Sequence, residues 1–284
     1  MHYSVLQRVR SLRHELSLRL SRRLRWSRGE FREEPAGELL DLAPAERDRI
    51  AQLRRAFGVD FAASEGAVTA RNNYAYLDAL VRAYGVFGEQ PPRAPVVVDV
   101  GCANFWYAAS LHAFFRPERL HGVEIDGYRR YRDGHTRHDY AQGHVRDLAG
   151  ATFTVADVAD LELPADVISA WFPFVTAGPL LAWRLPLSVL RPPALFASIR
   201  RNLRPGGRFL MVNQGAAEYQ AASGFAAHAG LEQHCDVCRL DLGFVGRTQP
   251  AVLSLWRPHV SRNARESDGG GRAAAAEVVD PVAP

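Results

Sequence analysis

A glycine turn follows a buried-strand pattern in the stretch VVVDVGCANFW, from Val96 to Trp106. A run of valines leads into Asp99 and then Gly101, and a glycine at the end of a strand permits a sharp turn and close approach of a ligand. A helix that follows such a turn offers free backbone N–H groups and the positive end of its dipole. The stretch is therefore a candidate binding site for an adenosyl cofactor.

The residues at the later glycine positions of the turn decide which cofactor it can accommodate. A dinucleotide-binding turn follows the pattern G-x-G-x-x-G, in which the second and third glycines make room for the pyrophosphate. In this chain the three positions hold Gly101, Ala103 and Trp106. The tryptophan would obstruct close packing of the helix on the strand, so the pattern disfavours NAD and FAD. A cofactor without phosphates needs less room.

The elements that must position this turn alternate between strand and helix. Strand patterns cover 95–100, 121–126, 152–158, 165–174 and 208–213, and then 235–242 and 251–258. The last two are close in sequence and predict an antiparallel pair. Alternating strands and helices imply parallel strands joined by right-handed crossovers. The sequence thus predicts an α/β fold with a doubly wound, mostly parallel seven-stranded sheet and an N-terminal helical extension.

The N-terminal part of the chain reads as helical and ends at the breaker-rich segment GEQPPRAP. We expect a helical extension over 1–88, the main domain over 89–260 and a disordered tail over 261–284. The first 34 residues are rich in arginine, and their apolar residues recur at helical spacing. Such a basic amphipathic helix either lies on an anionic surface, membrane or nucleic acid, or packs on its own domain.

Four segments, in order, resemble the class I (Rossmann-like) S-adenosylmethionine-dependent methyltransferases, over roughly residues 90–260. VVVDVGCANF resembles the first motif, an acid followed by G-x-G-x-G, and matches it at Asp99 and Gly101. LHGVEIDGY resembles the second strand and FTVADVADLELP the third-strand motif. ADVISAWFPF followed by LRPGGRFLMV resembles the fourth strand and the entry to the fifth. The ordered set of motifs is more specific than any one of them.

The resemblance implies S-adenosylmethionine as the cofactor and assigns roles to three acids. The acid that holds the ribose hydroxyls aligns with Glu124, and Asp126 is the alternative. The aspartate that contacts the adenine amino group aligns with Asp157, and Asp160 is the alternative. Asp99 either contacts the amino group of the cofactor or braces the turn by accepting backbone N–H bonds.

Gly101, Ala103 and Trp171 complete the expected cofactor-binding set. The chain departs from the family pattern at Ala103 and Phe105, which stand in place of the second and third glycines. Phe105 would either narrow the methionine end of the pocket or pack under the sheet.

No catalytic residue is assigned, because methyl transfer from a sulfonium mainly requires alignment of donor and acceptor. A general base is needed only for a protonated hydroxyl or amine acceptor. The fourth strand ends in an aromatic stretch, and its Phe172 would give an aromatic floor to the acceptor site. Asn213 ends the fifth strand, and Arg71 and Tyr74 lie on a helix that would form a lid, with Arg71 holding the cofactor carboxylate. The segment [ND]-P-P-[YFW], typical of families that methylate amino groups of bases or of glutamine, is absent.

Composition narrows the remaining classes. All 35 basic residues are arginine, which excludes a lysine Schiff base and a P-loop lysine. His234, Cys235 and Cys238 form an H-C-x-x-C cluster that lacks a fourth ligand, so no metal site is expected. The sequence has no apolar run of membrane-spanning length and no secretory signal. It predicts a cytoplasmic protein, with peripheral contact to a membrane as an alternative.

The sequence therefore predicts S-adenosylmethionine-dependent methyl transfer to a small-molecule acceptor. Three alternatives stay open. The first is a non-catalytic methyltransferase-like module that docks through its basic N-terminus. The second is an NAD-linked oxidoreductase. The third is an RNA or other nucleic acid methyltransferase whose arginine-rich start contacts phosphates.

Overall fold

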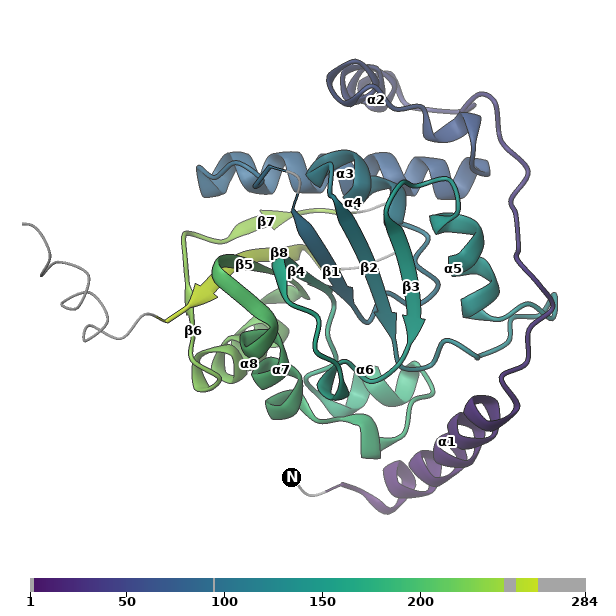
Figure 1. Ribbon diagram of the computed structural model, residues 1–284, viewed down its shortest axis with the longest axis vertical. Coiled ribbons are helices and arrows are strands. Elements are labelled where there is room, and N and C mark those ends of the chain that lie inside the picture. The colour runs from purple at the N-terminus through teal and green to yellow at the C-terminus, as the bar shows by residue number, and fades with distance from the viewer. Residues whose placement is uncertain (1–2, 94, 243–248, 260–284) are drawn as a thin grey trace, which may run out of the picture.

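The computed structural model describes residues 3–93, 95–242 and 249–259. Its centre is one sheet with the strand order β3-β2-β1-β4-β5-β8-β6, and β7 also pairs with β8 (Figure 1). No helix among these residues is long and apolar enough to cross a membrane. The predicted disordered tail, 261–284, lies outside the described residues.

Five strands are parallel and form the core of the sheet. They are β1 (Val96–Val100), β2 (Arg119–Glu124), β3 (Ala151–Val155), β4 (Ala165–Trp171) and β5 (Leu203–Gln214). The long strand β8 (Ala251–Pro258) runs antiparallel to β5. Two short strands, β6 (Leu231–Gln233) and β7 (Cys238–Leu240), pair antiparallel with successive parts of β8. The predicted seven-stranded, mostly parallel sheet is confirmed, with β6 and β7 sharing the last position.

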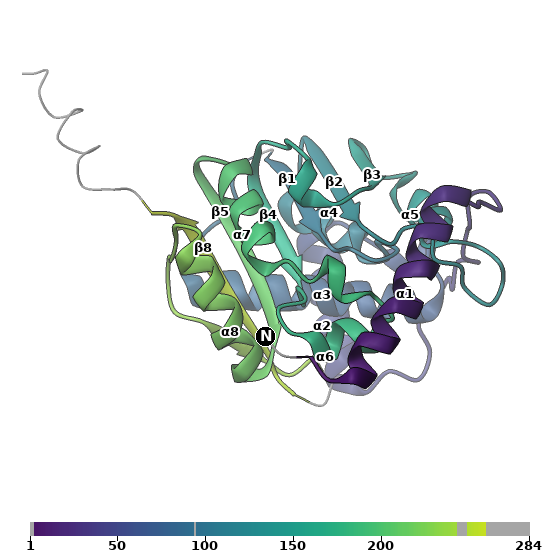
Figure 2. The same ribbon diagram turned by 90° about the horizontal axis from the view of Figure 1, so that it is seen from below.

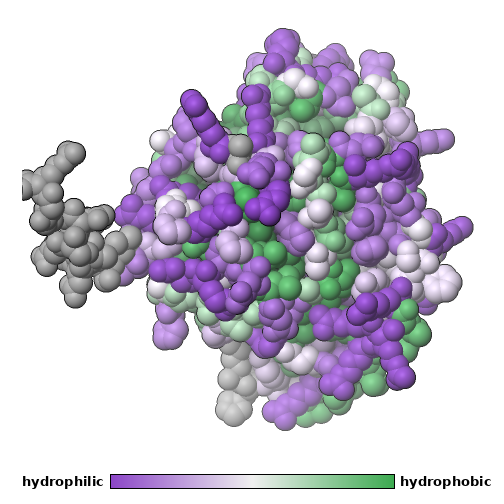
Figure 3. Space-filling view, viewed as in Figure 1, coloured by the Kyte–Doolittle hydropathy of each residue, from purple (hydrophilic) through white to green (hydrophobic). Residues whose placement is uncertain are grey.

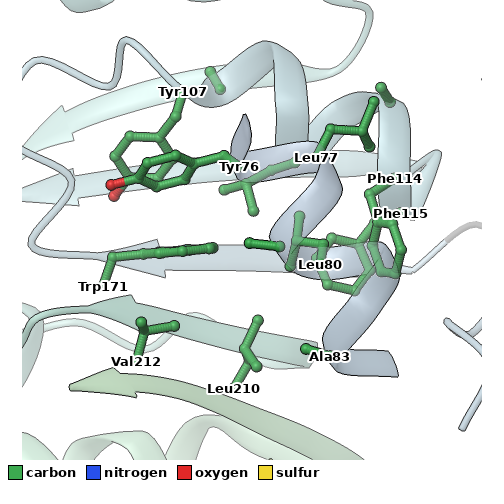
Figure 4. Close-up of a cluster of buried hydrophobic side chains, with 14 of the residues drawn as sticks. Tyr76, Leu77, Leu80, Ala83, Tyr107, Phe114, Phe115, Trp171, Leu210 and Val212 are labelled. Carbon is green, nitrogen blue, oxygen red and sulfur yellow. The ribbon is translucent and has the colours of Figure 1, made fainter. Parts of the chain in front are cut away.

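Helices cover both faces of the sheet (Figure 1). One face carries α3 (Ala67–Phe87), α4 (Ala108–Phe115) and α5 (Arg137–Val145), and the other carries α7 (Pro192–Asn202) and α8 (Gly215–His228). Successive strand residues point to opposite faces, so both faces of β1 are buried. Val97 accordingly lies in the core cluster under α3, and Val98 in the cluster under α7. Figure 4 shows the first of these clusters, in which Leu77 of α3 lies toward α4 and Leu80 and Ala83 lie on the side of Leu210 of β5.

A buried asparagine joins α3 to the turn after β1. The Nδ2 atom of Asn73 donates to Glu65 Oε2 and to the carbonyl oxygen of Trp106, each at 2.8 Å. Its Oδ1 atom accepts from the backbone N–H of Ser110 at 3.0 Å. These bonds satisfy a fully buried amide and fix the helix relative to the turn.

The pKa of Glu65 is raised to about 8, because the carboxyl is buried and lies near Glu33, against the effect of the Asn73 hydrogen bond. An acid with a raised folded-state pKa binds more protons in the folded protein than in the unfolded chain. The free energy of unfolding therefore falls as the pH rises from the ordinary value of 4.5 toward 8. We expect Glu65→Gln to raise the melting temperature by several degrees at a pH above 8 and to bring no such gain at pH 5. Equal shifts at both pH values, measured by calorimetry, would contradict this assignment.

The first 60 residues wrap around the sheet and its helices. The helix α1 (Val5–Leu24) packs against α6 (Ala177–Ala182) and the 3-10 turn η3 (Leu187–Val189), whereas α2 (Pro44–Phe57) packs on α3 at the far side. The connecting segment follows α5, where the ring of Phe31 stacks on Tyr140. A short turn η1 (Phe61–Ala63) leads into α3. The division of the chain at residue 88 stays a prediction.

Candidate functional site

A cavity of about 720 Å³ lies at the carboxyl ends of β1, β2 and β4. The chain leaves β1 toward β2 on one side and returns to β4 on the other, so the cavity sits at the point where strand order reverses. Figure 2 looks toward this edge of the sheet, with α1 and α6 in front. The size is within the range of small-molecule sites.

The turn after β1 forms one wall and has an unusual backbone. Gly101, Ala103 and Phe105 all have positive φ, of 75°, 53° and 55°. The turn thus keeps the left-handed conformation at the two positions where glycine is replaced, which is strained for residues with a Cβ. Phe172, just after β4, also has a positive φ, of 60°. Ala103 and Phe172 line the cavity, and such strain gathers at functional sites.

Phe105 packs under the sheet and does not line the cavity. Its side chain is fully buried and meets the ring of Tyr107 edge-on. Room for it comes from β2, because a Cβ at Gly122 would lie 2.6 Å from Phe105 Cδ1. The sequence left open whether Phe105 narrows the pocket or packs under the sheet, and in the structure it packs under the sheet. Trp106, by contrast, lines the cavity and meets Tyr76 edge-on.

Glu124 lies at the end of β2 with its carboxylate in the wall of the cavity, 5% exposed. Its oxygens accept from the backbone N–H groups of Ala103 and Asp126, both at 2.8 Å, and lie 3.5 Å from Arg137 Nη1. A carboxylate offers about four acceptor positions, so one is left for a ligand hydroxyl. The alternative acid, Asp126, is buried against Arg129 and Arg137 and does not line the cavity.

Asp99 is fully buried beneath the turn and does not line the cavity. It accepts hydrogen bonds from the hydroxyls of Ser169 and Tyr107. Burial raises the pKa of Asp99 to about 7, although both hydroxyl bonds oppose the shift. Among the described residues, the partners of Asp99 are two side-chain hydroxyls that connect the turn to β4, whereas the bracing alternative had named backbone N–H groups.

Asp157 follows β3 and caps the 3-10 turn η2 (Val158–Asp160) by accepting from the N–H of Ala159 at 3.0 Å. Its other oxygen pairs with Arg191. Asp157 lines the cavity beside Val158, whereas Asp160 does not. Trp171 also lines the cavity, and its ring packs against that of Tyr76 at a tilt of 32°, with 4.3 Å between the ring centroids.

Three residues predicted for the acceptor side lie away from the cavity. Arg71 pairs with Glu46 of α2 at 2.6 Å, and Tyr74 is buried with its hydroxyl bonded to Arg54. Asn213 is buried too, and neither polar atom of its side chain has a partner among the described residues. The face of α3 that reaches the cavity carries Asn72 and Tyr76 instead, and at the end of β5 the neighbour Gln214 lines it.

Arg137 of α5 is a cavity residue that the sequence did not single out. Only 5% exposed, it pairs with Glu124 and Asp126, and its guanidinium lies 5.5 Å from the centroid of the Trp183 ring. Its Nε, like Trp171 Nε1, is a buried donor without a partner in the described part of the chain. Buried polar groups are normally hydrogen-bonded, so orphaned donors in a cavity wall are typical of a site that receives a ligand or water. The sequence carries no local signal for Arg137 beyond its place in a polar, arginine-rich stretch after the second strand.

The segment between β4 and α7 covers the cavity, and hydrogen bonds from Arg129 and from α1 hold it in place. Arg129 donates to the carbonyl oxygens of Trp183 and Arg184, at 2.6 and 2.9 Å. From α1, Ser11 Oγ accepts from the N–H of Leu187 at 2.9 Å. This segment gives the cavity an apolar wall, made of Phe172, Phe174, Leu180, Trp183, Leu185 and Val189.

Within the described ranges, no group of three or more His, Cys, Asp or Glu side chains is arranged to hold a metal ion. Cys235 and Cys238 are free thiols.

No family model and no curated protein matches the chain. Among solved structures, it is similar to a TehB-like SAM-dependent methyltransferase from Corynebacterium glutamicum, at 18% identity, over 76% of this chain and 100% of that one, with a TM-score of 0.42. It is similar to Aeropyrum pernix fibrillarin with natively bound S-adenosyl-L-methionine, at 20% identity, over 64% and 76% of the two chains, with a TM-score of 0.43. It is also similar to a SAM-dependent methyltransferase from Aquifex aeolicus, at 12% identity, over 63% and 88%, with a TM-score of 0.43. By its own strand order and parallel core, the chain has the Rossmann-like α/β fold that the motifs implied.

Proposed function

We propose that this protein binds S-adenosylmethionine in the cavity and transfers its methyl group to a small apolar or aromatic acceptor. The observation that carries the proposal is the Glu124 carboxylate, which faces the cavity from the end of β2 beside a left-handed turn. An acid at this place, next to the turn after the first strand, suits the hydroxyls of a ribose.

The residues that line the cavity suit S-adenosylmethionine, which, unlike a dinucleotide, carries no pyrophosphate. Glu124 would accept from a ribose hydroxyl at its remaining acceptor position, and Asp157, beside the apolar Val158, would accept from the adenine amino group. The Nε1 of Trp171, which has no hydrogen-bond partner among the described residues, would donate to the amino acid end of the cofactor. When bound, S-adenosylmethionine supplies an electrophilic methyl group on a sulfonium. The protein then has only to align the acceptor with this methyl group and to exclude water.

The acceptor is proposed to be apolar because of the wall that faces it. Phe172, Phe174 and Trp183 bring three aromatic rings to the cavity from the segment between β4 and α7. Aromatic and aliphatic walls with few polar groups are typical of small-molecule pockets.

Calorimetry with S-adenosylhomocysteine tests the proposal. We expect saturable binding at micromolar ligand and no response in a parallel titration that follows nicotinamide fluorescence. No heat at millimolar ligand would overturn the proposal and favour a non-catalytic module. If the cofactor binds, a screen of small apolar acceptors with isotope-labelled cofactor, read by mass, identifies the acceptor.

A further inference from the structure

The helix α1 is amphipathic, but it packs on the protein by its polar side and turns its apolar side to solvent. The side that lies on α6 and η3 is mostly polar, with Ser11, Glu15 and a single buried leucine, Leu18. Ser11 and Glu15 bond to Leu187 and Ser188 of η3. Polar side chains therefore attach the helix to the protein.

The opposite side of α1 is an apolar stripe that faces solvent. With 3.6 residues per turn, the stripe residues recur every three or four positions on the side away from η3. They are Val5, Val9, Leu12, Leu16 and Leu20, which are 58–79% exposed, flanked by Leu6 and Leu24. Single exposed leucines are ordinary, but a contiguous stripe on one helix indicates a binding surface.

Arginines border this stripe. The helix contains six arginines and one glutamate, and the glutamate already pairs with Arg19. Arg8, Arg10, Arg13 and Arg23 form no ion pair with the described part of the chain. In the space-filling view, hydrophobic and hydrophilic side chains lie side by side over α1, at the lower right (Figure 3).

The surroundings of α1 add positive charge from other elements. The pKa of His14 is lowered first by burial and then by Arg129, Arg13 and Arg184. Arg184 lies in the segment over the cavity and forms no ion pair within the described residues, so positive charge extends beyond the helix, whereas Arg129 pairs with Asp126. Trp26, just past the end of α1, is 52% exposed, and its indole N–H reaches Gly134.

We propose that α1 docks on a membrane surface that carries anionic lipid headgroups, with the stripe in the acyl boundary and the arginines at the headgroups. An anionic membrane is the occupant that satisfies both features at once. A nucleic acid would pair with the arginines and leave the leucines in water, and a second copy of α1 would bring two rows of arginines together. Because α1 also packs on α6 and η3, docking holds that edge of the cavity beside the bilayer.

Sedimentation of the full chain with vesicles tests the docking. The vesicles are pure phosphatidylcholine, or phosphatidylcholine with about a third phosphatidylglycerol. We expect binding to the anionic vesicles only, weakened by salt because the contacts are charged.

Three variants separate the contributions. Leu12→Gln/Leu16→Gln/Leu20→Gln removes the centre of the stripe and should weaken binding by about tenfold or more. Arg8→Gln/Arg10→Gln/Arg13→Gln should abolish the preference for anionic lipid. The matched control, Val68→Gln/Val86→Gln, removes two equally exposed valines from α3 and should change nothing. Melting temperatures check that each variant is folded.

Several outcomes would overturn the docking: no binding to anionic vesicles, or equal binding by the stripe variant. So would a dimer that the stripe variant abolishes, or tighter binding to duplex RNA than to vesicles. None of these measurements involves the cofactor, so the docking and the methyl-transfer proposal fail separately.

Discussion

Glu124→Ala is expected to weaken S-adenosylhomocysteine binding by about a hundredfold or more, and Glu124→Gln by about tenfold, since a hydrogen bond to a charged group contributes about 1.5–3 kcal/mol. The carboxylate would accept from the ribose while it also accepts from the N–H of Ala103, so the variant loosens both the ligand and the turn. The alanine variant further leaves the buried Arg137 with Asp126 as its remaining carboxylate. Calorimetry measures the loss.

Asp126→Asn is the matched control for Glu124. Both acids are buried and both pair with Arg137, but only Glu124 lines the cavity. We expect Asp126→Asn to lower the melting temperature at least as much as Glu124→Gln and to leave cofactor affinity within about threefold. If both variants lose affinity in proportion to their stability, Glu124 has only a structural role.

Gly122→Ala is expected to destabilise the fold by about 2–3 kcal/mol, as overpacking of a close-packed core does. The added Cβ would lie 2.6 and 2.7 Å from two ring atoms of Phe105 and 3.0 Å from Cys102 Sγ. Both contacts belong to the turn that forms the cavity wall. Urea unfolding measures the loss.

A double-mutant cycle assigns this strain to Phe105. Phe105→Leu alone should cost about 1–2 kcal/mol through lost packing, and it should cost less, or nothing, in the Gly122→Ala background. Gly224 of α8 is the control, because its Cβ would meet nothing within 4 Å, and Gly224→Ala should be neutral or slightly stabilising. Additive losses would show that Gly122 and Phe105 are not coupled.

Most of the sheet could be predicted because its strands carry their own patterns, although the short strand β6 was not among the predicted ones. The continuous valine run of β1 marks a strand buried on both faces, and the structure has it at Val96–Val100. The predicted antiparallel pair is present as β7 and β8. The sequence defined the ends of these elements less well. The strand predicted over 121–126 begins two residues earlier, at Arg119, and the helix after the glycine turn begins only at Ala108.

The acids of the site could also be placed from sequence. Glu124 and Asp157 follow strands, and the carboxyl ends of parallel strands meet at one edge of the sheet. Side chains on helices could not be placed in this way. Which side of α3 reaches the cavity depends on how the helix rotates against α4. That packing turns Asn72 and Tyr76 inward, and Arg71 toward α2.

By itself the sequence determined most of the strands, the sharp turn at Gly101 after the first of them and the acids at their ends, because these follow from local pattern and from the geometry of a parallel sheet. The tertiary structure alone decided that Phe105 fits against Gly122, that Arg137 joins Glu124 in the cavity wall, and that α1 turns all its leucines but Leu18 outward. Each of these depends on contacts between residues far apart in the chain, whose partners no local pattern specifies.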